Sequence, residues 1–136
     1  MGTWAVDAFG NDTACDWVYG LDEAEDLAPV EAALEAIIAN GNEYLDASLA
    51  EEALVAIEVI ARLQGNWGER SAYSEGVDDW VEKVKLVPSD ELAQKALQVL
   101  DRIVAEDSEM KELWEDSDEY DAWVAAIEEL RERIKA

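Results

Sequence analysis

The sequence predicts an all-α protein, a compact single-domain bundle of five or six helices over residues 1–136 with an aromatic-rich N-terminal segment packed on the first helix. Three observations predict this fold class. Apolar residues recur at helical spacing through most of the chain. No segment alternates for long enough to build a sheet. Hydrophobic residues make up 50% of the 136 residues, which is enough for a core without metal or disulfides.

The first helix is expected to begin near Asp12, because Asn11 or Asp12 can accept hydrogen bonds from the first free backbone amides. Its apolar residues share one face at helical spacing: Ala14, Trp17, Val18 and Leu21. Trp4 and Phe9 precede the helix. We expect both rings to fold back onto that face.

Two further helices follow in the first half. Pro29 suits the first turn of the second helix, and the Asn40-Gly41-Asn42 turn closes it near Ala39. A capping box, Ser48-x-x-Glu51, indicates where the third helix starts, and its apolar stripe continues to Leu63. A polar, glycine-rich connection over residues 65–76 follows. It contains Trp67, which follows no helical stripe and is either an exposed contact residue or a lid over the core.

The second half predicts a short helix over 78–84 and a longer one that starts at Pro88-Ser89 and ends near Val104. Asp107-Ser108 should cap another short helix, and the last helix should run from about Asp118 to the end. The stripes over 49–63 and 92–104 are the longest and most regular, so these two helices should form the centre of the bundle.

Two motifs at opposite ends of the chain form a recognisable pattern. The first is G-T-W, a short gap, and F-x-N-D-x-A-x-D-W, which comprises Gly2, Thr3, Trp4, Phe9, Asn11, Asp12, Asp16 and Trp17. The second runs from Ser108 to Glu115 and continues to the last helix, with Leu113, Trp114 and Trp123 as its apolar members. The pattern resembles a bacterial family of small domains of unknown function. The resemblance implies structural roles for these residues and assigns no activity.

The charge is the most unusual property of the sequence. There are 34 Asp and Glu against 10 Lys and Arg, a formal net charge of −24, and residues 1–61 contain 14 acids and no Lys or Arg. Such a field repels phosphate backbones and anionic lipid headgroups, so we expect no binding to nucleic acid or membranes. It attracts a basic partner.

The sequence carries no catalytic signature. It has no His, which removes Ser-His and Cys-His nucleophile pairs and histidine metal sites, and we expect no enzyme activity, metal or cofactor. Cys15 is the only cysteine, so no internal disulfide forms and a reducing, cytoplasmic location is the simpler interpretation. The N-terminus lacks the cationic start and apolar core of a signal peptide.

These observations favour a non-catalytic binding protein, such as an immunity protein or an inhibitor, that engages a basic protein partner. The candidate contact residues are two acidic clusters and one loop tryptophan: Asp22, Glu23, Glu25, Asp26, Trp67, Glu115, Asp116, Asp118, Glu119 and Asp121. One alternative is a helical adaptor, monomeric or oligomeric, whose acidity reflects a halophilic host or solubility. The other is a carboxylate-dependent enzyme that uses Asp12 and Asp16, one helical turn apart.

Overall fold

A computed structural model of the chain describes residue 9 and residues 12–135. These residues form seven α-helices and no strand, which confirms the all-α class. The helices are α1 Asp12–Asp22, α2 Ala28–Asn40, α3 Ala47–Leu63, α4 Glu75–Val84, α5 Asp90–Ile103, α6 Glu109–Glu115 and α7 Tyr120–Lys135.

The expected count of five or six helices is wrong, because both short segments expected along the chain, α4 and α6, are helices in their own right. They have 10 and 7 residues, whereas an isolated helix shorter than about 12 residues is marginal in water. Tertiary burial holds both in place, since the indoles of Trp80 on α4 and Trp114 on α6 are buried. The Trp80 Nε1 also donates a hydrogen bond to the Ala24 carbonyl at 2.9 Å, which joins α4 to the segment after α1.

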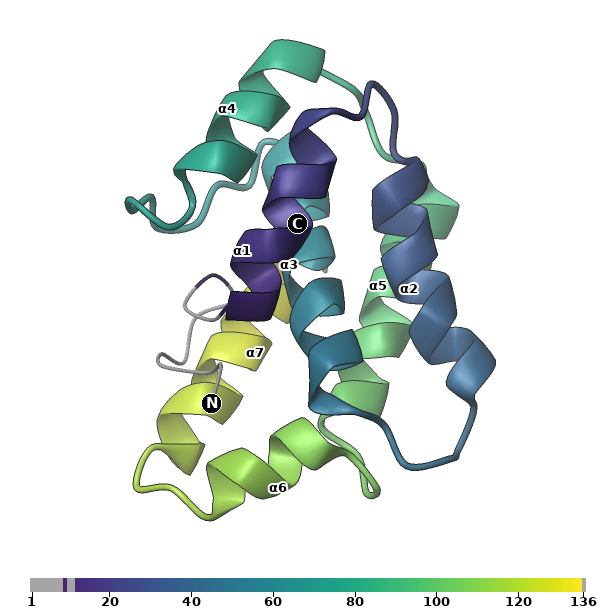
Figure 1. The fold of residues 1–136 in the computed structure, drawn as a ribbon, viewed down its shortest axis with the longest axis vertical. Helices are drawn as coiled ribbons and strands as arrows, with labels where there is room; N and C mark the ends of the chain where they lie inside the picture. The colour runs from purple at the N-terminus through teal and green to yellow at the C-terminus, as the bar shows by residue number, and fades with distance from the viewer. Residues whose placement is uncertain (1–8, 10–11, 136) are drawn as a thin grey trace.

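Helix α3 forms the centre of the molecule, as its long apolar stripe predicts. It packs against each of the other six helices, and every residue from Ala53 to Arg62 is buried. Figure 1 shows α1 in front of α3, α2 and α5 on one side of it, and α6 and α7 below. The second half of the chain surrounds α3 as well, with α4 at the top of the view, α5 beside α2, and α6 and α7 at the bottom.

Several helix ends follow the sequence signals. Pro29 lies in the first turn of α2, and Gly41 ends that helix with φ of 62°, a left-handed value that favours glycine. The Ser89 hydroxyl accepts a hydrogen bond from the Leu92 amide at 3.1 Å at the start of α5. The Ser108 hydroxyl does the same for the Lys111 amide at 3.4 Å in α6. These caps are local, which is why sequence finds them.

The predicted capping box at the start of α3 is wrong. The helix begins at Ala47, one residue before Ser48, and Asp46 occupies the cap position without a side-chain cap bond. The Ala47 amide instead donates to the Glu109 carboxylate of α6 at 2.8 Å. Backbone bonds on either side, from the Leu45 amide to the Asp107 carbonyl and from the Glu109 amide to the Leu45 carbonyl, hold the two loops together. A partner 62 residues away thus replaces the local cap.

The predicted core is confirmed with exceptions. Ile57 is fully buried, whereas Leu97 on α5 is only partly buried and Leu113 is exposed. The sequence motif at the N-terminus is described in part: Phe9 is buried and Trp17 is partly buried against the core. The remaining motif residues of the start of the chain lie outside the described residues: Gly2, Thr3, Trp4 and Asn11.

Candidate functional site

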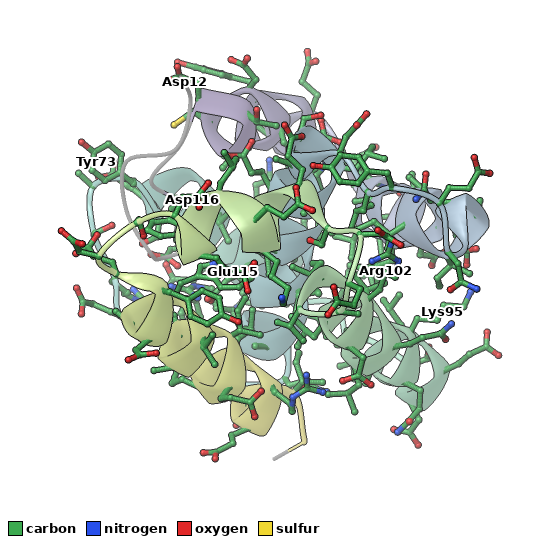
Figure 2. The ribbon with its side chains drawn as sticks, turned by 90° about the horizontal axis from the view of Figure 1, so that it is seen from below. Asp12, Tyr73, Lys95, Arg102, Glu115 and Asp116 are labelled. Carbon is green, nitrogen blue, oxygen red and sulfur yellow. The ribbon has the colours of Figure 1, made fainter. Side chains whose placement is uncertain are left out.

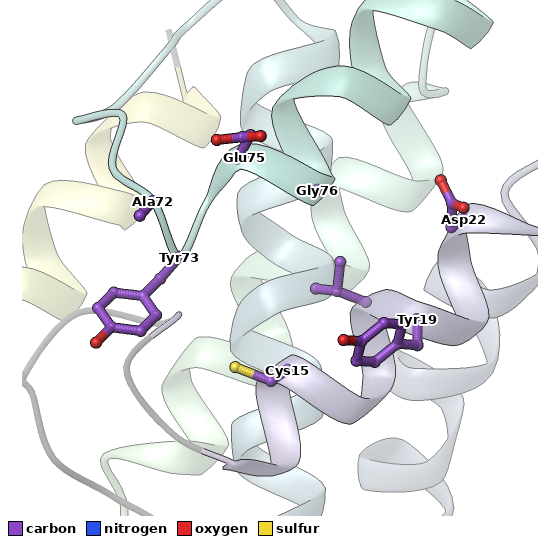
Figure 3. Close-up of a pocket in the computed structure, with 8 residues that line it drawn as sticks. Cys15, Tyr19, Asp22, Ala72, Tyr73, Glu75 and Gly76 are labelled. Atoms are coloured by element: carbon purple, nitrogen blue, oxygen red, sulfur yellow. The ribbon is translucent and has the colours of Figure 1, made fainter.

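An open groove separates α1 from the turn that leads into α4. Its volume is about 430 Å³. Its lining comes from both sides: Cys15, Val18, Tyr19, Asp22, Ala72, Tyr73, Glu75 and Gly76. Figure 3 shows Cys15, Tyr19 and Asp22 along α1 and Tyr73 and Glu75 on the facing segment, with the ring of Tyr73 directed away from Cys15 and Tyr19. Volumes of about 300 to 1,000 Å³ are typical of ligand sites in proteins.

The helical period of α1 creates one wall of the groove. Residues three or four positions apart lie on the same helix face, so Cys15, Tyr19 and Asp22 form an outward stripe. The inward face carries the buried Ala14 and Leu21. Of the apolar face predicted from sequence, Val18 lines the groove, and the other α1 lining residues come from the outward stripe.

Gly76 sets the distance between the two walls. A Cβ atom at this position would lie 2.7 Å from Val18 Cγ1, closer than real Cβ contacts. Only glycine therefore lets the first turn of α4 approach α1 this closely without a shift of the Val18 side chain.

The two tyrosines are the most exposed parts of the lining. Tyr19 is 78% exposed and Tyr73 is 56% exposed, while Cys15 is partly buried. Large aromatic rings that remain in water are a common feature of contact surfaces. The described lining therefore contains two exposed tyrosines and two carboxylates.

A buried arginine fixes the second wall. Arg62, at the end of α3, is 1% exposed. Its Nε donates to Asp78 Oδ1 on α4 at 2.7 Å, and one terminal nitrogen donates to the Glu69 carbonyl at 2.8 Å. Another terminal nitrogen pairs with Glu58 one turn earlier on α3. Arg62 thus ties α3, the 64–74 connection and α4 together.

Short polar contacts complete the turn before α4. The Ser74 hydroxyl donates to Asp78 Oδ2 at 2.8 Å and accepts from the Ser71 amide at 2.8 Å. Ser74 is itself fully buried. Tyr73 therefore lies in a turn that the Ser74 hydroxyl joins to Asp78, a member of the buried ion pair.

A second arginine extends this network to α7. Arg133 contacts Glu58 Oε2 at 2.7 Å and Glu129 Oε2 at 2.7 Å. Burial opposes the charge of Arg133, but the hydrogen bonds and attraction of Glu58 and Glu129 outweigh it and raise its pKa. Gly68 packs on this guanidinium, because a Cβ there would lie 2.7 Å from Arg133 Cζ.

Trp67 lies over the same network. The guanidinium carbons of Arg70 and Arg62 are 3.9 Å and 5.7 Å from its ring centroid. The side chain is partly buried and packs against the core. Of the two roles open to Trp67 from sequence, this arrangement favours the lid.

The first predicted acidic cluster lies beside the groove. Its four members, Asp22, Glu23, Glu25 and Asp26, are exposed. Asp22 lines the groove itself, and Asp26 Oδ1 accepts a hydrogen bond from the Ala28 amide at 3.0 Å at the start of α2. Among the described residues, no Lys or Arg forms an ion pair with any of the four.

The second predicted cluster surrounds the α6–α7 turn at the far end of the molecule. Its members are exposed: Glu115, Asp116, Asp118, Glu119 and Asp121. Glu115 is partly neutralised by Lys111, 2.9 Å away. The structure does not bring the two clusters into one lining.

Asp12 and Asp16, the pair considered for catalysis, are both exposed on α1. Neither lines the groove. No group of three metal-ligating side chains in the described part of the chain is placed to hold a metal ion. No helix among the described residues combines the length and the apolarity that a membrane crossing requires.

Sequence reasoning missed the groove tyrosines, Glu75 and the buried Arg62. The spacing of Glu58 and Arg62, one turn apart on α3, is a typical ion-pair signal. Tyr19 could have been noticed from sequence, because a large aromatic residue on the polar face of an amphipathic helix is unusual. Tyr73 and Glu75 come from a turn, and no periodic pattern places a turn against a distant helix.

Comparison with known proteins gives the family. Neither the curated proteins nor the solved structures contain a match to this chain. The family model described as "Domain of unknown function (DUF4259)" matches residues 2–126. Since the match covers most of the 136 residues, the chain belongs to the DUF4259 family.

Proposed function

We propose that this protein is a non-catalytic binding protein that engages a basic protein partner through the acidic surface of α1 and the segment that follows it. This surface, called here the α1 acidic surface, consists of Asp12, Asp16, Asp22, Glu23, Glu25 and Asp26. The observation that carries the proposal is that all six carboxylates are exposed, while the ion pairs of the described residues all lie elsewhere.

Most cations of the chain are committed to other groups, whereas Lys83 and Lys85, at the end of α4, are exposed and form no ion pair among the described residues. Six Lys and Arg side chains form ion pairs with carboxylates outside the α1 acidic surface: Arg62, Arg70, Lys95, Lys111, Arg131 and Arg133. Arg102 donates instead to four backbone carbonyls. The α1 acidic surface therefore keeps its field for an external partner.

A basic partner gains most from such a surface during encounter. Unpaired surface charges steer diffusion and raise the association rate, and the effect falls with ionic strength because the Debye length is only about 10 Å at 0.1 M salt. Complementary charge can also occlude a phosphate-binding surface without any chemistry. An immunity protein for a nuclease-type toxin, or an inhibitor that imitates nucleic acid, fits this description.

The overall distribution of acids favours a second candidate, a helical adaptor whose acidity serves solubility or a halophilic host. Within the described residues, exposed carboxylates occur on six of the seven helices, and only the central α3 lacks them. Figure 2 shows them on all sides of the view, including Glu115 and Asp116 at the α6–α7 turn. The distribution of carboxylates alone therefore does not identify the contact surface. The α1 acidic surface is preferred because its carboxylates form no ion pairs among the described residues.

Capture of proteins from the native host at low salt tests the proposal. The test variant carries Asp22→Asn, Glu23→Gln, Glu25→Gln and Asp26→Asn, and the amide oxygen introduced at position 26 can still accept the hydrogen bond from the Ala28 amide. A control with the same charge change neutralises exposed acids at the two ends of α5: Asp90, Glu91, Glu106 and Asp107. Helix α5 packs on α2, α3 and α7.

The expected result is a basic protein that binds the natural chain and the α5 control and elutes at much lower salt from the α1 variant. Equal recovery on both variants, or recovery of no basic protein, would leave the adaptor interpretation as the better one.

A further inference from the structure

We infer that Tyr19 and Gly20, two neighbouring exposed residues of α1, form the contact point at which the basic protein partner docks. The inference rests on the proposed function and deepens it, because charge alone does not say which part of the α1 acidic surface the partner covers. These two residues are called here the Tyr19–Gly20 patch.

Tyr19 stands among carboxylates on the solvent side of α1. Asp12, Asp16 and Tyr19 follow one another at i, i+4 and i+7, so they share one side of the helix. The opposite side carries the buried Ala14 and Leu21. Tyr19 is the large apolar side chain that α1 leaves in water, with 78% of its surface exposed. A cationic side chain can lie over such a ring while the neighbouring carboxylates balance its charge.

Gly20 is a glycine that the fold itself does not require. Among the described glycines, Gly41 and Gly65 have positive φ values of 62° and 90°. A Cβ atom at Gly68 or Gly76 would lie 2.7 Å from a neighbouring side chain. Gly20 has no positive φ, and a Cβ atom there would meet no atom of another segment within 4 Å.

This exposed glycine has a cost to the helix. Glycine inside a helix is less stable than alanine, and it is favoured where a ligand approaches the backbone closely. Since nothing within the chain accounts for Gly20, we assign the close approach to the partner.

The patch is bordered by acids at both ends. Asp16 lies one turn before Gly20, and Asp22 and Glu23 follow it at the end of α1. Figure 3 shows Tyr19 and Asp22 on this part of the helix. A Lys or Arg side chain whose aliphatic stem crosses the bare backbone of Gly20 therefore reaches the Tyr19 ring and the carboxylates together.

A second copy of the chain is a poor occupant of the patch. Each copy has a formal net charge of −24, so two copies repel each other at low salt, where a basic partner is attracted most strongly.

A titration with hexa-lysine amide at low salt, followed by NMR of the isotope-labelled natural chain, locates the contact. The backbone amide signals of Tyr19 and Gly20 should shift more than those of the second acidic cluster, such as Asp116. The same titration gives the affinity for the peptide.

Two variants test the patch. Tyr19→Ala removes the ring, and Gly20→Gln covers the bare backbone with a neutral side chain. Each should weaken hexa-lysine binding roughly 2- to 5-fold, the range that one exposed cation–π contact gives. Gly20→Gln should at the same time raise Tm by roughly 2–5 °C, because glutamine is a better helix former than glycine. Higher stability with lower affinity is the signature of a contact residue and not of a residue that maintains the fold.

Matched controls place the same changes elsewhere. Tyr44→Ala removes an exposed tyrosine between α2 and α3, and Ala125→Gln adds the same neutral side chain at an exposed position of α7. Both variants should bind hexa-lysine like the natural chain.

The outcomes separate this inference from the proposed function. If Tyr19→Ala and Gly20→Gln bind like the natural chain while the variant neutralised at Asp22, Glu23, Glu25 and Asp26 binds less, the patch is wrong and the α1 acidic surface stands. If that charge variant also binds like the natural chain, both fail.

Two further results would overturn the inference. A lower Tm in Gly20→Gln would mean that the fold needs this glycine. A dimer in sedimentation that Tyr19→Ala abolishes would make the patch a self-association site.

Discussion

Replacement of Arg62 by Met tests the buried ion pairs that hold the start of α4 against α3. Met keeps an unbranched apolar stem of similar length in the space that the Arg stem fills, but it removes every hydrogen bond of the guanidinium. Arg62 is the shared partner of Glu58, Asp78 and the Glu69 carbonyl, so one substitution disconnects three segments.

The magnitude follows from what each acid retains. Glu58 keeps two hydrogen bonds from Arg133, at 2.7 Å and 3.0 Å. Asp78, whose side chain is 6% exposed, keeps only the Ser74 hydroxyl as a side-chain partner among the described contacts. Removal of one member of a buried pair costs about 3–5 kcal/mol because the other charge is left uncompensated. We expect the loss of unfolding free energy to fall in that range and to arise mainly at Asp78.

Urea unfolding of the natural chain, Arg62→Met, Asp78→Asn and the double variant measures the coupling. The Asp78→Asn change removes the charge at that position, so the double variant should be more stable than Arg62→Met alone. Additive losses in the double variant, or a loss below about 1 kcal/mol for Arg62→Met, would show that the ion pair does not hold α4.

Four further predictions concern the core, a close contact, one phenol and the total charge. Ile57→Ala should lower the free energy of unfolding by about 2–5 kcal/mol, because it leaves a cavity at the centre of the core. Leu97→Ala should lower it less in the same urea assay, because Leu97 is only partly buried. Gly76→Ala should cost about 1–3 kcal/mol through contact with Val18, and Val18→Ala should reduce that cost; an unchanged cost would rule out the contact as its cause. The hydrogen bond to Glu112 raises the pKa of Tyr44 to about 12, so its contribution to stability is present below pH 10 and is lost as pH rises through about 12; absorbance at 295 nm should show this late phenol disappear in Tyr44→Phe and move toward 10 in Glu112→Gln. The free energy of unfolding should rise with sodium chloride because screening relieves repulsion in a chain of net charge −24, and a midpoint independent of salt would mean that the acids repel one another little.

Sequence predicted the parts of the fold that depend on near neighbours. The apolar stripe of α3, Pro29 in the first turn of α2 and the serine caps of α5 and α6 all act within a few residues, so their physical effect is visible in the chain itself.

The start of α3 was not predictable in this way, because the carboxylate that takes its first amide belongs to α6. The groove could not be predicted from sequence for the same reason. Tyr19 and Tyr73 are 54 positions apart, and only the packing of α4 on α1 brings them to one lining. The acidic cluster from Asp22 to Asp26 was visible from composition, whereas the absence of ion pairs around it, within the described residues, required the cations to be placed in space.

The association rate of the captured basic protein, measured against ionic strength, tests the central claim most directly. For the natural chain and the α5 control, the rate should fall steeply from low to physiological salt while the dissociation rate changes little. For the variant without the charges of Asp22, Glu23, Glu25 and Asp26, the low-salt rate should be lower and the dependence on salt shallower. The same steep dependence in that variant would contradict the account and would place the steering charges elsewhere on the molecule.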